Sequence, residues 1–168
     1  MRALIPHPSS FILLAAALLL ASCGFQLRGS APMPFKSIYV ESAPASPFAT
    51  QFRRVVRASG DTQMADRPGE AQVILQIMNE LQDKQILSLS GGGRVSEYRL
   101  QYRVFFRLTD VKNREHIPAS EIVLRRDYSY SDSQALSANF DEALLYRDMR
   151  DDAVRQLVRR LQATKLQS

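Results

Sequence analysis

Few side chains of this 168-residue sequence could catalyse a reaction or bind a metal. Cys23 is the only cysteine, so no intrachain disulfide can form. His116 is the only histidine outside the N-terminal leader, and without a cysteine partner it provides no zinc-type ligand set. Gly91-Gly92-Gly93-Arg94 lacks the Lys-Ser/Thr pair of a phosphate-binding loop, and no Gly-x-Ser-x-Gly nucleophile elbow is present. We therefore predict that the protein is not an enzyme, has no catalytic residues, and needs no metal or other cofactor.

The remaining reactive group is the thiol of Cys23. The leader before it carries one basic residue, Arg2, and then an apolar run over residues 11–21, which is too short for a permanent membrane-spanning helix of roughly 20 residues. Leu20-Ala21-Ser22-Cys23 is similar to a bacterial lipobox, in which the cysteine is acylated and becomes the new N-terminus. We expect a lipoprotein signal peptide at residues 1–22 and membrane attachment through acylated Cys23. The alternative is an ordinary signal peptide with an incidental cysteine.

The chain after the leader is expected to form one anchored domain. Residues 23–34 are rich in Gly, Ser, Ala and Pro and predict a lipidated tether, whereas residues 35–168 have the composition of a single globular domain. Gly24, not Asp, follows the cysteine, which under enterobacterial sorting rules favours the outer membrane. The net charge of +5 suits an anionic neighbour such as lipid phosphate, and export argues against a nucleic-acid partner.

The elements that must position these residues follow from hydrophobic periodicity. Residues 37–41, 71–90, 94–109 and 121–131 predict strands, and residues 47–59 and about 139–163 predict helices. In the second strand we expect Val73, Leu75, Ile77 and Leu81 on one face and Glu80, Gln82 and Lys84 mostly on the other. The order β-α-β-β-β-α predicts an α+β, two-layer sandwich: a mainly antiparallel four-stranded sheet with both helices on one face.

The polar face of this sheet and its hairpin turn are candidate binding surfaces. Arg99, Arg103 and Arg107 share one side of the third strand, opposite its aromatic and aliphatic side chains. This side is either a solvated sheet face or a surface that meets anionic groups or a polar partner, and the sequence leaves both open. Gly91-Gly92-Gly93 is expected to project beyond the helices, with Arg94 as the nearest cation.

Three motifs carry a resemblance to a known family. The first is the anchor cluster Cys23-Gly24-Phe25-Gln26-Leu27-Arg28-Gly29, the second is Ser96-Glu97-Tyr98 after the hairpin, and the third is Tyr146-Arg147-Asp148-Met149 with the residues Ala153, Gln156-Leu157 and Arg159-Arg160-Leu161 that follow it. In this order, and with the predicted arrangement of elements, the sequence resembles the LptE family of lipopolysaccharide-assembly lipoproteins.

The resemblance implies a role in the outer membrane of Gram-negative bacteria. A member of this family would form a heterodimer with the barrel LptD, sit in the barrel lumen on the periplasmic side, assist assembly of the barrel, and support delivery of lipopolysaccharide to the outer leaflet. Candidate lipopolysaccharide-binding residues are Arg94, Arg99 and Arg103, and the candidate barrel-contact tip is Gly91, Gly92 and Gly93. The sequence lacks the cations that the family carries at the tip itself and before the last helix. A lipid carrier that acts without a barrel is the alternative.

Overall fold

A computed structural model describes residues 32–130 and 135–166, with the side chains of residues 135–140 excepted. The predicted signal peptide at residues 1–22 and the predicted lipidation site Cys23 lie outside the described residues, as does most of the predicted tether. Met33, which the sequence assigns to that tether, already packs against the hydrophobic core.

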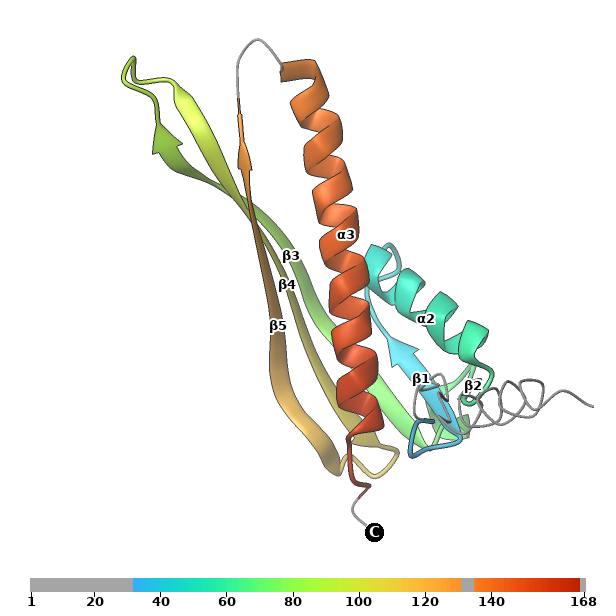
Figure 1. Ribbon diagram of the computed structural model, residues 1–168. Helices are drawn as coiled ribbons and strands as arrows, with labels where there is room; N and C mark the ends of the chain where they lie inside the picture. The colour runs from blue at the N-terminus through green and yellow to red at the C-terminus, as the bar shows by residue number, and fades with distance from the viewer. Residues whose placement is uncertain (1–31, 131–134, 167–168) are drawn as a thin grey trace, which may run out of the picture. The chain divides into compact units, whose positions relative to one another are not determined.

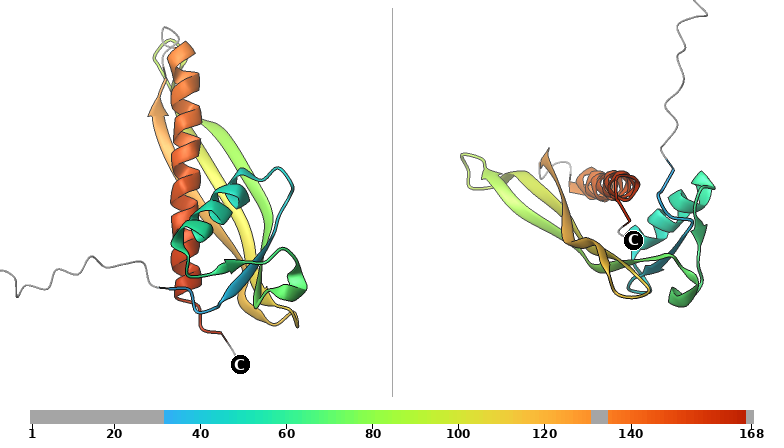
Figure 2. Two further views of the ribbon diagram at one scale, coloured as in Figure 1. Left: turned by 90° about the vertical axis from the view of Figure 1, so that its right-hand side faces the viewer. Right: turned by 90° about the horizontal axis from the view of Figure 1, so that it is seen from below.

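Five strands form one sheet, and two helices lie against one of its faces (Figures 1 and 2). The strands are β1 (Ser37–Glu41), β2 (Gln63–Met64), β3 (Val73–Leu89), β4 (Val95–Asp110) and β5 (Glu115–Ser129), in the spatial order β2-β1-β3-β4-β5. The helices are α2 (Pro47–Ser59) and α3 (Ala135–Gln162), and a single 3₁₀ turn, η1, spans Pro68–Glu70. The predicted α+β two-layer class, with both helices on one face, is confirmed.

The predicted strand number of four is wrong by one, because the two-residue β2 gives no periodic signal of its own. β2 pairs in parallel with β1, and β1 pairs in parallel with β3, whereas β3, β4 and β5 form an antiparallel meander. Helix α2 lies in the long connection between β1 and β3, as a parallel pair requires. The sheet is therefore mixed, although its two longest ladders are antiparallel.

Local sequence signals explain why α2 forms where it does. The Ser46 hydroxyl accepts a hydrogen bond from the Ala49 amide at 3.0 Å, and Pro47 occupies the first helical position. Gly60 ends the helix in the left-handed conformation at φ 72°. The apolar face of α2, with Phe48 and Phe52 fully buried, packs on the sheet.

The core lies between the sheet and the C-terminal part of α3. Alternate residues of β4 are fully buried on the face toward the helices, namely Leu100, Tyr102, Val104, Phe106 and Leu108. Met149, Ala153, Leu157 and Leu161 of α3 are buried against them. Helix α3 begins at Ala135, before the expected Asn139, since Ala and Leu near its start have high helix propensity.

A β-bulge at Met78 changes the faces of β3. The register shifts between Ile77 and Asn79, so Leu81 pairs with Arg103 on the outer face of the sheet, and Glu80 pairs with Val104 on the helix side. The expectation that Leu81 shares a face with Val73, Leu75 and Ile77 is therefore wrong. The bulge turns polar residues after it, including Glu80 and Lys84, toward the helices.

Beyond Gln82 the hairpin leaves the helical layer. Residues 83–99, here called the blade, contain the end of β3, the turn and the start of β4, and they diverge from α3 toward their tip (Figure 1). The rest of the described domain, here called the base, contains the buried core. The glycine turn stands to one side of α3, whose start lies level with it in Figure 1, so the hairpin diverges from the helices but does not extend beyond them, contrary to the prediction from the sequence.

Candidate functional site

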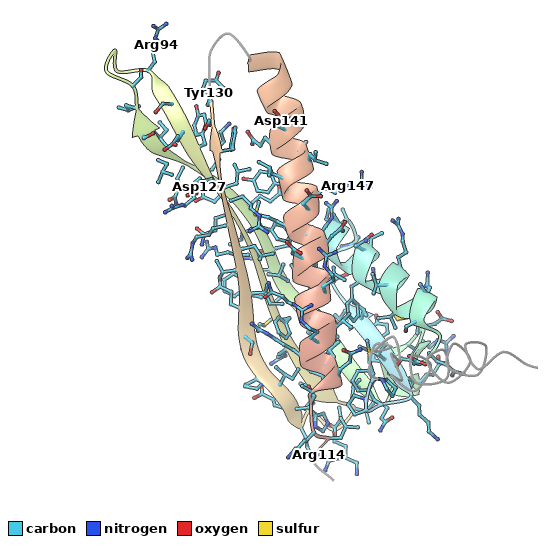
Figure 3. The ribbon with its side chains drawn as sticks, viewed as in Figure 1. Arg94, Arg114, Asp127, Tyr130, Asp141 and Arg147 are labelled. Carbon is cyan, nitrogen blue, oxygen red and sulfur yellow. The ribbon has the colours of Figure 1, made fainter. Side chains whose placement is uncertain are left out.

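The tip of the blade is a tight, exposed turn. Gly93 donates to the Ser90 carbonyl at 2.9 Å and Ser90 donates to the Arg94 carbonyl at 2.7 Å. Gly93 has φ 74°, a conformation that residues with a Cβ rarely adopt. Arg94 points away from the turn (Figure 3) and forms no ion pair with another described residue. This tight turn places the Arg94 guanidinium at the exposed end of the long β3–β4 hairpin.

Large apolar side chains surround this turn without a partner in the domain. Ile86 is 59% exposed, Leu89 is 58% exposed and Leu87 is 40% exposed. Ile86 and Leu87 are adjacent and Leu89 follows after Ser88, and water contacts much of the surface of all three. Apolar side chains gathered in this way on a projecting element are typical of a surface that meets another molecule.

Arg99 is held by a carboxylate on the outer face of the sheet. Its Nε and Nη2 atoms each lie 2.8 Å from an oxygen of Asp127 on the neighbouring strand β5, which gives a two-point contact. The hydrogen bond from Arg99 lowers the pKa of Asp127, and the same contact raises the pKa of Arg99. Both side chains are more than one third exposed, so water and salt screen this pair and it contributes little to the stability of the fold.

Arg103 is about as exposed as Arg99 but is less well paired. Its Nη1 atom lies 3.8 Å from Glu121 Oε1, and its guanidinium carbon lies 5.8 Å from the centre of the Phe105 ring. The Nε atom of Arg103 and Oε1 of Glu121 are buried without a hydrogen bond. These two atoms are therefore buried polar groups that a water molecule or a partner could still satisfy, although both side chains are about one third exposed.

The three predicted arginines do not form one cluster. Arg99 and Arg103 share a face, about 13 Å apart along β4, and Arg94 lies about 30 Å from Arg103 at the strand rise of ~3.3 Å per residue. Sequence reasoning placed the cations on the correct face, but their partners Asp127 and Glu121 depend on the β4–β5 register, which the sequence does not reveal. The outer face is thus a row of ion pairs with Arg94 beyond its end.

A second group of residues, missed by the sequence analysis, joins the blade to α3. Lys84 Nζ lies 2.6 Å from Glu142 Oε2 and 4.1 Å from the centre of the Tyr98 ring. The Tyr128 hydroxyl donates to Glu142 at 3.0 Å, and the Tyr146 hydroxyl donates to the Asp83 carbonyl at 2.8 Å. We call Lys84, Tyr98, Tyr128, Glu142 and Tyr146 the polar clamp.

Electrostatics within the polar clamp keep its lysine charged. Partial burial alone would lower the pKa of Lys84, but its contacts with Glu142 and Tyr128 outweigh burial and raise it. Burial is also the main cause of the raised pKa of Tyr128. The Met78 bulge determines that Lys84 faces α3, because without the bulge Lys84 would lie on the outer face of the sheet.

Glu80 plays a comparable role in the base. Its carboxylate accepts hydrogen bonds from the Tyr102 hydroxyl at 2.6 Å and the Ser46 hydroxyl at 2.7 Å. It thereby ties the N-terminus of α2 to the centre of the sheet. Burial, and then the hydrogen bond to Glu80, raise the pKa of Tyr102, so the phenol stays protonated.

Two tests for other kinds of site concern only the described part of the chain. Within residues 32–130 and 135–166, no three His, Asp or Glu side chains gather as metal ligands. No helix in the same ranges is both long enough and apolar enough to span a membrane.

Comparisons with known proteins match most of the chain. The family model LptE, described as lipopolysaccharide-assembly, matches residues 35–161. The LPS-assembly lipoprotein LptE of Photorhabdus laumondii is 28% identical over 152 residues, which cover 87% of this chain and 80% of that protein. The protein of the same name from Yersinia enterocolitica is 28% identical over 159 residues, covering 92% of this chain and 76% of that protein.

Solved structures agree with the architecture. The solution structure of an uncharacterized lipoprotein B from Nitrosomonas europaea superimposes with a TM-score of 0.72 at 37% identity, covering 83% of this chain and 91% of that one. The rare lipoprotein B of Shewanella oneidensis gives a TM-score of 0.66 at 22% identity, covering 75% of this chain and 93% of that one. At this lower identity the second similarity shows the fold alone.

Proposed function

The chain belongs to the LptE family of lipopolysaccharide-assembly lipoproteins, and from this premise we propose that it plugs the outer-membrane barrel LptD and assists its assembly. In this role it supports delivery of lipopolysaccharide to the outer leaflet as a non-enzymatic subunit of a heterodimer. It is anchored to the membrane by an acylated Cys23, and its domain sits in the barrel lumen on the periplasmic side.

The observation that carries this proposal is the contrast between the polar outer face of the sheet and the few exposed apolar side chains of β3 near the turn. The lumen of a membrane barrel is polar, so a plug needs a wettable surface and its own core. The outer sheet face supplies ion pairs such as Arg99–Asp127, and the core is enclosed by the helices. The exposed Ile86 and Leu89 then give the blade an apolar surface for the barrel wall or its assembly intermediates.

Site-specific photocrosslinking in cells tests the barrel contact. A crosslinker at Leu89 should give an adduct with a large outer-membrane barrel protein, because this residue lies beside the tip and is exposed. A matched crosslinker at Lys112, exposed in the turn between β4 and β5 at the other end of the sheet, serves as control. Absence of a barrel adduct from Leu89, together with purification of the chain without any barrel, contradicts the proposal.

Mass spectrometry tests the anchor independently. The mature chain should begin at Cys23 and carry the added mass of acyl chains on that residue. A mature N-terminus elsewhere, or an unmodified cysteine, contradicts the lipid anchor but leaves the barrel contact to be judged by crosslinking.

Binding of lipopolysaccharide is proposed for Arg94 first, and for Arg99 and Arg103 on the outer face. Arg94 is exposed at the tip, and a guanidinium can hold a phosphate through two hydrogen bonds. A crosslinker at position 94 should capture lipopolysaccharide more efficiently than one at Arg57, an exposed residue near the end of α2. Equal capture at both positions contradicts the role of Arg94.

The lipid-carrier alternative receives no support from the described residues. A carrier needs an apolar cavity, and side chains of α2 and α3 fill the inner face of the sheet.

A further inference from the structure

The two helices enclose a polar groove on the side away from the sheet. Its volume is about 430 Å³, and it lies between the first turns of α2 and the middle of α3. The side chains that line it include Thr50, Arg54, Arg147, Arg150 and Asp151. Arg147 leaves α3 beside the N-terminal end of α2 (Figure 3). The groove is separate from the tip, from the outer sheet face and from the polar clamp.

Positive charge in this groove is not balanced by the protein. Three guanidinium groups line it with a single carboxylate, that of Asp151. None of the three arginines forms an ion pair with any residue that the structure describes, and Arg54 donates only to the neutral Gln51 side chain, at 3.2 Å. Farther along α3, by contrast, Arg155 is paired with Asp152, which also holds Arg126.

Repulsion among the three arginines destabilises the groove, and a bound anion would relieve this repulsion. Like charges that line one groove repel one another, and the repulsion grows where protein replaces water. Arg150 is only partly exposed, so it cannot recover its full hydration by turning outward. A ligand with two negative charges would match the excess of cations over carboxylate.

We propose that the groove formed by Arg54, Arg147 and Arg150 binds a phosphoryl group. Planar guanidinium groups from two helices can hold several phosphate oxygens at once, and this geometry suits a phosphate or pyrophosphate better than a single carboxylate. The groove is large enough for a pyrophosphate or for the headgroup of a phospholipid. The phosphoryl group comes either from a free phosphate compound or from a membrane lipid. The site does not depend on the barrel partnership.

Calorimetric titration of the full chain, purified in an uncharged, phosphate-free detergent, tests this site. Sodium pyrophosphate should bind saturably at low ionic strength. Arg147→Gln and Arg150→Gln together should weaken binding by roughly tenfold or more for each arginine removed, since each hydrogen bond to a charged group contributes strongly to affinity. Dihexanoyl phosphatidate, titrated in parallel, distinguishes the sources: tighter binding than pyrophosphate indicates a lipid headgroup, and equal or weaker binding indicates a free phosphate compound.

A matched variant controls for the loss of charge. Arg125→Gln and Arg159→Gln together remove the same number of cations from exposed positions on β5 and near the end of α3. This control should bind pyrophosphate within about twofold of the unmodified chain, because screened charges outside the groove contribute little. Circular dichroism verifies that both double variants are folded. Absence of pyrophosphate binding, or equal weakening in the two double variants, overturns the proposal.

Discussion

Different interactions stabilise the base and the blade of this domain. In the base, large side chains such as Phe52 and Leu157 are fully buried, and each contributes a few kcal/mol. The blade touches α3 through the polar clamp, whose contacts each contribute about 1 kcal/mol or less, and leaves Ile86 and Leu89 in water. The difference indicates that buried apolar contacts stabilise the base, whereas polar contacts with α3 hold the blade and its apolar side chains stay exposed.

The largest expected effect comes from the core of the base. Phe52→Ala should destabilise the domain by about 3–5 kcal/mol, because it removes a fully buried aromatic ring and leaves a cavity. Leu144→Ala changes a side chain that is 55% exposed on α3 and should cost less than about 0.5 kcal/mol. Thermal unfolding followed by circular dichroism measures both. Similar losses in the two variants would mean that the buried Phe52 ring contributes no more to the stability of the base than an exposed side chain does.

A pair of tyrosines gives a sharper comparison. Tyr102→Phe in the base removes a buried hydrogen bond to Glu80 and should cost about 1–3 kcal/mol. Tyr98→Phe keeps the ring that stacks on Tyr128 and removes a hydroxyl that makes no hydrogen bond with a described residue, so its cost should be near zero. Chemical denaturation of both variants provides the measurement, and a larger loss for Tyr98→Phe would reverse our assignment.

We expect the polar clamp to affect local opening of α3 more than the global free energy of unfolding. Lys84→Met removes the ion pair with Glu142 and the contact with Tyr98, and we expect a global loss of about 1 kcal/mol or less. Hydrogen exchange should nevertheless accelerate over residues 141–148 of α3 and leave residues 153–161 unchanged. Equal acceleration over both ranges would mean that α3 opens as one unit and that the polar clamp has no local effect on it.

The smallest effect is confined to acidic pH. Two backbone amides and the Arg114 guanidinium hydrogen-bond Asp110 in the base, and these bonds lower its pKa to about 2. Since an unfolded aspartate titrates near pH ~3.9, its contribution is complete above that pH and is lost as the pH falls toward the folded pKa. In acid titrations, Asp110→Asn should reduce the pH dependence of the free energy of unfolding between the unfolded and the folded pKa of Asp110. An unchanged profile would contradict the assignment.

The sequence predicted α2 and the alternation of β4 better than it predicted the faces of β3 and the pairing of β4 with β5. The Ser46 cap, the Gly60 stop and the alternation of β4 are local signals, and each corresponds to a feature of the structure. The Met78 bulge leaves no such signal. In the sequence Leu81 continues the apolar alternation of Val73, Leu75 and Ile77, but the extra residue in the bulge places Leu81 on the opposite face of the sheet. That single residue decides that Glu80 and Lys84 face the helices. The ion-pair partners of Arg99 and Arg103 depend on strand register in the same way.

The parallel pairing of β1 with β3 has a consequence for how the chain acquires its structure. Ile38 pairs with Val73, across the whole of α2, whereas Thr109 and Glu115 pair across a short turn. Short loops close within tens of nanoseconds and long ones more slowly, so the β4–β5 hairpin is expected to nucleate and β1 to dock late. Until β1 docks, the edge of β3 over residues 73–76 is an unpaired template for another strand, which favours aggregation of the partly folded chain.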